Sequence, residues 1–184
     1  LLGIALGCVM ITLLYSFKFI IAFIIMGGAA AVIPATRVRL LQIADMSQNI
    51  SRIKVWKTAG YMIKDHLFLG VGNGNFYTQY GSYVEKHPEL VNTYDTIQVL
   101  HPHNIFLKIQ CELGVMGTLS FIGIIVSTFR DLIKYIRLER EPFFYNFYRG
   151  FFVSITVFMA MNLIVNFFSA PKVIEFFWFF LAIF

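Results

Sequence analysis

The sequence predicts an all-α integral membrane protein with several transmembrane helices and one long, partly helical extracytoplasmic loop. Two observations support this fold class. Of the 184 residues, 58% are hydrophobic and only 14% are charged, which is more apolar surface than a soluble domain of this length can bury. The apolar residues also fall in long runs that charged clusters separate, as they do in membrane spans.

Five apolar runs are the candidate transmembrane helices: 1–15, 19–35, about 105–129, 150–168 and 173–184. The runs that are complete are long enough to cross roughly 30 Å of hydrocarbon at about 1.5 Å per residue. The chain opens without Met inside one apolar run and closes inside another. We therefore expect a fragment of a larger protein, with two spans in 1–35, a loop over 36–104, and three spans in 105–184, the last one truncated.

The orientation in the membrane follows from a basic loop at 130–142, which contains four Lys or Arg residues between positions 130 and 140. Short loops of this kind remain in the cytoplasm. Counting spans back from it places 36–104 outside. That loop holds seven Lys or Arg, but it is too long for the positive-inside rule to govern. An anionic ligand or simple solubilisation explains its basic character.

The outer loop contains a predicted amphipathic helix over about 52–65. Its apolar positions recur at helical spacing, with basic residues between them, so the helix suits the membrane interface. Asn49 or Ser51 is the expected N-cap. Arg52 precedes Trp56 by one turn and is expected to point toward the apolar side. The apolar stripe consists of Ile53, Trp56, Ala59, Gly60 and Ile63, widened by Val55 and Met62.

Three alternating glycines, Gly70, Gly72 and Gly74, follow this helix and permit tight turns. A nucleotide-binding loop is one interpretation, but the run lacks the Lys of a P-loop and follows a helix rather than a strand. We favour the alternative, in which the glycines let the backbone pack closely against the membrane domain.

The segment His101-Pro102-His103-Asn104 opens the third span, and both Pro102 and Asn104 are typical of helix starts. His103 is therefore expected at the membrane surface beside the positive end of a helix. There the imidazole is biased toward its neutral form and could act as a base. A structural role is the alternative, and a metal site is disfavoured because no HExxH or CxxC spacing occurs.

Lys108 and Glu112 follow in the same span, four residues apart, and are expected to pair. Ionisable groups this close to hydrocarbon suggest a function. We assign both residues a supporting position behind the site, although simple mutual neutralisation at a helix end explains them equally well.

These motifs resemble a known family. The order Arg52, Trp56, then D-H-L-F-L-G-V-G-N-G-N-F, then H-P-H-N-I-F-L-K-I-Q-C-E-L-G-V-M-G is similar to the O-antigen ligase and O-antigen polymerase superfamily of bacterial membrane glycosyltransferases. The similarity covers about 52–117. Proteins of this family are polytopic and helical, with a large extracytoplasmic loop between late spans, and they reside in the cytoplasmic (inner) membrane.

The resemblance implies an enzyme that transfers a polysaccharide from undecaprenyl diphosphate to lipid A core, in ligases, or to another glycan repeat, in polymerases. It implies Arg52 as the diphosphate-binding residue and His103 as the catalytic base, with Trp56 and Asn104 as further substrate-binding candidates. Neither cofactor nor metal is implied. The partners are then the lipid-linked glycan donor, the acceptor and membrane lipids, without nucleic acid. The family's other essential arginine belongs to an earlier outer loop.

Two alternatives come from other functional classes. A polysaccharide or lipid transporter, or flippase, could also present a basic outer loop with His and Arg, but we would then expect internal repeats or broken helices near the bilayer midplane. A non-catalytic membrane scaffold is the other alternative. Between ligase and polymerase, the sequence favours the ligase only slightly.

Overall fold

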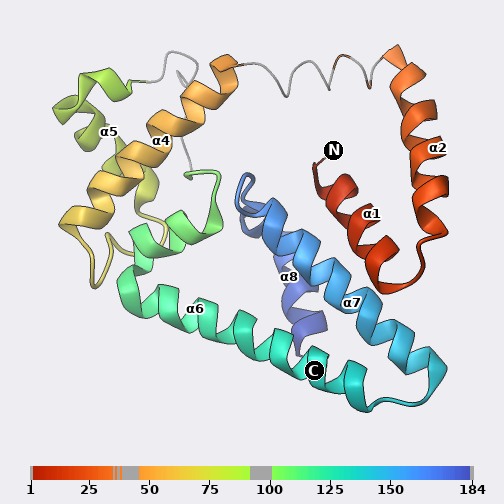
Figure 1. The fold of residues 1–184 in the computed structure, drawn as a ribbon. Coiled ribbons are helices and arrows are strands. Elements are labelled where there is room, and N and C mark those ends of the chain that lie inside the picture. The colour runs from red at the N-terminus through yellow and green to blue at the C-terminus, as the bar shows by residue number, and fades with distance from the viewer. Residues whose placement is uncertain (1, 35, 37, 39–45, 92–100, 183–184) are drawn as a thin grey trace.

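The computed structural model describes residues 2–34, 36, 38, 46–91 and 101–182, and within these ranges every regular element is a helix (Figure 1). This confirms the all-α expectation. The elements are α1 (Leu2–Leu14), α2 (Phe19–Val32), α4 (Met46–Asp65), α5 (Phe76–Lys86), the 3-10 helix η1 (Pro88–Leu90), α6 (Ile105–Leu138), α7 (Pro142–Met161), the 3-10 helix η2 (Phe167–Ser169) and α8 (Pro171–Leu181).

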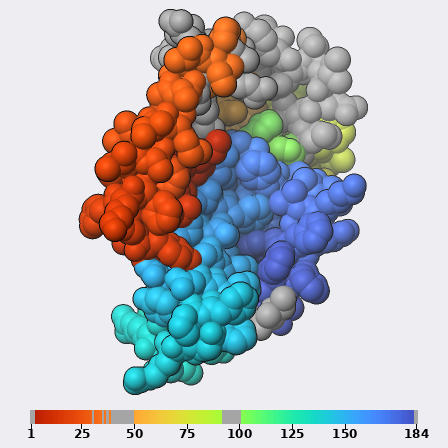
Figure 2. Space-filling view, turned by 90° about the vertical axis from the view of Figure 1, so that its right-hand side faces the viewer, coloured from red at the N-terminus to blue at the C-terminus, as the bar shows by residue number. Residues whose placement is uncertain are grey.

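The helices form two groups that α6 connects (Figure 1). In one group α4 and α5 pack against the start of α6 around Val55, Met62, Phe76 and Cys111. In the other, α7 and α8 pack against α6 around an aromatic core that includes Phe121, and α1 packs on α7. Figure 2 shows α2 at one side of this second group and α8 at the other.

A kink divides α6 at Gly114, whose φ of 65° and ψ of −162° are not helical. The straight part after the kink, residues 115–138, is about 36 Å long, enough to cross roughly 30 Å of hydrocarbon. By length and composition, α6 is the one helix among the described residues that could cross a membrane. The apolar helices α1 and α2 have 13 and 14 residues, so the multi-pass arrangement remains a prediction.

The basic segment expected as a loop is largely helical. Residues 130–138 form the last turns of α6, and α7 begins at Pro142 rather than at 150. Lys and Arg are good helix formers, so charge alone does not end a helix. The start of α7 has its own signals, because Pro142 occupies the first turn and the Glu141 carboxylate accepts a hydrogen bond from Phe144 N at 2.8 Å.

The helix expected over 52–65 is α4, and it begins earlier, at Met46. Asn49 and Ser51 lie inside it, so the prediction that either caps it is wrong. Its buried face is also rotated relative to the expected stripe. Val55, Ala59 and Met62 are buried at the spacing i, i+4, i+7, whereas Ile53 is 47% exposed.

Candidate functional site

The glycine-rich loop after α4 packs its backbone directly against the kink of α6. Val71 N and Gly72 N donate to the carbonyl oxygens of Cys111 and Glu112 at 2.8 and 2.9 Å, and Val115 N donates to Leu67 O at 3.0 Å. The kink leaves the carbonyls of Cys111 and Glu112 and the N–H of Val115 without their regular helical partners, and the loop supplies replacements. A broken helix is tolerated near a membrane when its freed backbone groups find other hydrogen-bond partners in this way.

Two of the glycines leave no room for a side chain. A Cβ at Gly70, where φ is +68°, would overlap the carbonyl carbon of Glu112. A Cβ at Gly114, where φ is +65°, would overlap the carbonyl oxygen of Phe68. The interpretation of the glycine run as a close-packing segment is therefore confirmed at Gly70, whereas a Cβ at Gly72 would meet only Asn75 of the same loop and one at Gly74 would meet nothing within 4 Å.

Asn104 caps α6, as predicted. Its side-chain Oδ1 accepts hydrogen bonds from Phe106 N at 2.9 Å and from Leu107 N at 3.1 Å. Ile105 N donates to Asn162 O at 3.0 Å, and Lys108 N donates to Asn104 O at the same distance. The first N–H groups of α6 thus all have partners inside the protein. An anionic substrate here would have to be bound by side chains.

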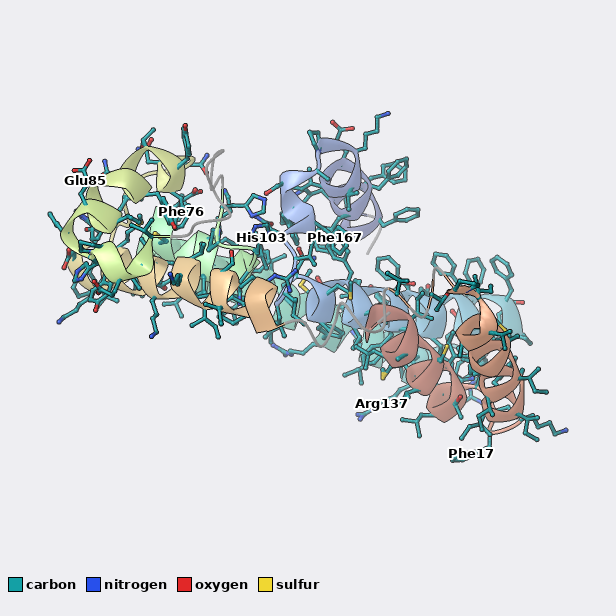
Figure 3. The ribbon with its side chains drawn as sticks, turned by 90° about the horizontal axis from the view of Figure 1, so that it is seen from above. Phe17, Phe76, Glu85, His103, Arg137 and Phe167 are labelled. Carbon is teal, nitrogen blue, oxygen red and sulfur yellow. The ribbon has the colours of Figure 1, made fainter. Side chains whose placement is uncertain are left out.

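Trp56 joins α4 to the turn that precedes α6. Its indole Nε1 donates a hydrogen bond of 2.7 Å to the carbonyl oxygen of Pro102. Pro102 is buried, and it separates the two histidines of the turn in the sequence. Arg52 lies one turn earlier on the same helix, about 6 Å along its axis. The structure therefore brings the helix that carries Arg52 against the turn that carries His103, which Figure 3 shows between the α4–α5 group and η2.

Arg52 itself is half-buried. In the part of the chain that the structure describes, its guanidinium has no hydrogen bond or ion pair. A permanently charged, planar group with uncommitted donors is suited to binding an anion.

His103 is held in an unusual backbone conformation. Its φ is 50°, the one positive value that the described residues show outside glycine, and such conformations are disfavoured for residues with a Cβ. Its backbone N–H donates to Nδ1 of His101 at 3.2 Å, and the two rings meet edge to face at 4.6 Å. The turn thus presents the exposed His103 side chain at the start of α6.

His101 is the inner member of this histidine pair. Burial, assisted by the neighbouring His103 and Lys108, lowers the pKa of His101 to about 4, while Glu112 acts in the opposite direction. The ring is therefore neutral at pH 7. This agrees with the role of its Nδ1 as an acceptor, which requires an unprotonated nitrogen.

Lys108 and Glu112 pair as predicted. The distance from Lys108 Nζ to Glu112 Oε2 is 2.7 Å, and the Glu112 side chain is only 3% exposed. Removing either partner from a buried pair leaves an uncompensated charge. Both members of the pair influence the pKa of His101, in opposite directions.

The other two histidines lie elsewhere. His66 is exposed after the end of α4, and His87 stacks on Tyr61 with ring centroids 4.0 Å apart. Among the described residues, no three or more His, Cys, Asp or Glu side chains are grouped so that they could hold a metal ion.

Sequence reasoning missed Asn162. This residue ends α7, is fully buried, and fixes the start of α6 through its carbonyl. A signal was present, because Asn162 and Asn166 interrupt an otherwise apolar run, and polar residues at membrane depth are often functional.

Comparison with known protein families matches residues 1–122 to the family described as O-antigen ligase. The match ends within α6, so it includes both α4 and the histidine turn. No curated protein matches the chain, and no solved structure does either.

Proposed function

The chain belongs to the O-antigen ligase family, and on this premise we propose that it transfers a glycan from undecaprenyl diphosphate to an acceptor at the outer face of a bacterial inner membrane. Membership in this family indicates a membrane enzyme of the glycosyltransferase kind that uses lipid-linked glycans. The identity of the donor, the roles of the residues and the direction in the membrane are our proposal.

The hydrogen bond from Trp56 to Pro102 is the observation that carries this proposal. It ties the helix of Arg52 to the turn of His103, which supports the proposal that one substrate contacts both side chains. Because the indole N–H is already used in this bond, we assign Trp56 to positioning the site rather than to a polar contact with substrate. Asn104 likewise uses its Oδ1 as a cap, which leaves its amide nitrogen as the group that could bind substrate.

Arg52 is proposed to bind the diphosphate of the donor. Charge develops on the leaving diphosphate as the glycosidic bond breaks, and a guanidinium offers planar, bidentate donors to it. Because the backbone N–H groups at the start of α6 are occupied, this stabilisation falls to side chains.

His103 is proposed to act as the general base. The acceptor hydroxyl attacks the anomeric carbon, its proton passes to the imidazole, and the bond from that carbon to the diphosphate oxygen breaks. Undecaprenyl diphosphate leaves. A direct attack of this kind inverts the anomeric centre.

A transporter is the second candidate, and one observation favours it. The break in α6 at Gly114 is a feature of helices that line transport sites. The two functions differ in their product, because a transporter forms no new glycosidic bond.

Purified full-length protein, incubated with lipid-linked glycan and either lipid A core or a second glycan repeat, tests the proposal. We expect a new glycosidic product that forms without nucleotide and in the presence of EDTA, because the described residues offer no metal-ligand group. The acceptor that is used distinguishes ligase from polymerase. Transfer of the intact lipid-linked glycan across a membrane, without any product, would contradict the proposal and support the transporter.

A further inference from the structure

The turn between α7 and α8 lies at the start of α6, close to the proposed catalytic base. Asn162 O accepts the hydrogen bond from Ile105 N at 3.0 Å, two residues after His103. Figure 3 shows His103 and Phe167, which belongs to this turn, beside each other. The turn contains two buried asparagines, Asn162 and Asn166.

The two side-chain amides differ in their partners. Asn162 Nδ2 donates to Phe158 O at 2.8 Å, and Asn162 Oδ1 accepts from Phe167 N at 2.8 Å. Asn166 is also buried, with 5% exposure, but neither its Nδ2 nor its Oδ1 has a hydrogen-bond partner in the described part of the chain. Hydrogen bonds within the fold therefore explain why the Asn162 amide is buried, whereas no such bond explains the burial of the Asn166 amide.

A buried amide without partners destabilises a fold, and an apolar side chain of similar shape would suit the position better. The neighbouring residues are indeed aromatic: Phe167 stacks on Phe158 at 6.2 Å, and Phe168 packs against Phe121 at 5.6 Å. An amide at this position requires a partner that this structure does not contain.

We propose that the Asn166 carboxamide binds two hydroxyl groups of the sugar next to the reacting glycosidic bond; this inference rests on the proposed function. An amide donates through Nδ2 and accepts through Oδ1, so hydroxyls, which do both, satisfy each end. A phosphate only accepts hydrogen bonds and would leave Oδ1 unpaired. The amide therefore fits the glycan rather than the diphosphate.

Binding requires the turn to shift, because the amide is shielded from solvent here. The segment consists mainly of the three-residue 3-10 helix η2 and single turns. Short 3-10 segments often mark hinges. The donor glycan and the acceptor saccharide both carry hydroxyls, and the kinetics described next separate these two sources.

The test compares Asn166→Leu with Asn162→Leu in the purified full-length protein. Thermal unfolding is measured for each variant, together with initial rates of transfer at varied lipid-linked glycan and varied acceptor. Asn166→Leu should unfold at the parent's temperature or higher and yet lose about tenfold or more in kcat/KM, as expected for a lost hydrogen bond to substrate. Asn162→Leu is the matched control and should unfold at a lower temperature.

If Asn166 binds the donor sugar, kcat/KM of Asn166→Leu falls for the lipid-linked glycan. If Asn166 binds the acceptor, kcat/KM falls for the acceptor. Two results overturn the inference: a variant that is as active as the parent, or one that unfolds at a clearly lower temperature, which would show that the amide has a partner within the fold. If the parent itself forms no glycosidic product, the proposed function fails and this inference fails with it.

Discussion

The unusual backbone conformation of His103 allows the chemical role of its side chain to be tested separately from the effect of the residue on stability. At a φ of 50°, glycine is favoured over residues with a Cβ by about 1 kcal/mol. We expect His103→Gly and His103→Ala each to lose about a hundredfold or more in transfer rate if the ring is the base. Thermal unfolding should nevertheless show the Gly variant to be at least as stable as the Ala variant.

His66→Ala is the control for this comparison, because His66 is exposed and lies outside the histidine turn. It should keep nearly the parent's rate. Full activity of His103→Gly would contradict the assignment of the ring as the base.

At the residue scale, the sequence predicted the cap at Asn104 and the Lys108–Glu112 pair because both depend on partners within four positions in the chain. The bond from Trp56 to Pro102 crosses 46 positions, and no local pattern predicts such a contact. The role of Arg52 came from the family resemblance, whereas a base at His103 was suggested by its place before a helix start and then implied by the resemblance; both roles remain predictions. The turn with Asn162 and Asn166 was missed because its position depends on how α7 packs against α6.

The close approach of the glycine loop to α6 can be tested with two glycines of the same backbone type. Gly70 and Gly74 have φ values of 68° and 77°, so Ala costs about the same in backbone conformation at either position. At Gly70 the added Cβ meets the backbone of Glu112, whereas at Gly74 nothing lies within 4 Å.

Gly70→Ala should therefore lower the unfolding temperature of the purified protein clearly more than Gly74→Ala does. Because the loop replaces hydrogen bonds of the broken helix, Gly70→Ala should also reduce the yield of inserted protein. Equal effects at the two positions would show that the packing of the loop against the kink is not what requires glycine.

At the element scale, hydropathy located the apolar runs but not the ends of the helices. The runs at 105–129 and 150–168 correspond to α6 and α7, which extend over Ile105–Leu138 and Pro142–Met161. The differences arise because basic residues continue a helix as readily as apolar ones do, whereas capping by Glu141 and Pro142 ends the intervening loop. Hydropathy also does not report a kink such as the one at Gly114.

The orientation of the whole molecule is tested by labelling in intact cells. In a protein from which Cys8 and Cys111 have been removed, single cysteines are placed at Ser82 on α5 and at Leu138 at the end of α6, both of which are exposed. A membrane-impermeant thiol reagent should label the cysteine at position 82 but not the one at 138 until the cells are permeabilised. The reverse pattern would invert the topology and put the proposed site in the cytoplasm.

The whole-molecule architecture could be predicted only in part. Composition was enough to predict the helical class. So apolar a chain is expected in a membrane, where a helix pairs all backbone N–H and C=O groups within the same segment. The division into two groups joined by α6 depends on Gly114 and on the loop that packs there, and neither the kink nor its partner follows from apolar patterning.

Arg52 and His103 are proposed to act on one substrate at one site. Initial rates of glycan transfer by the purified full-length parent, Arg52→Lys, His103→Ala and the double variant test whether they do. Lys keeps the charge but loses the bidentate geometry, so each single variant should be severely impaired while still inserted and folded. Residues that act as a unit are strongly non-additive, so the double variant should be about as slow as the slower single variant. Single variants that match the parent, or losses that multiply fully in the double variant, would show that the two residues do not act together on one substrate.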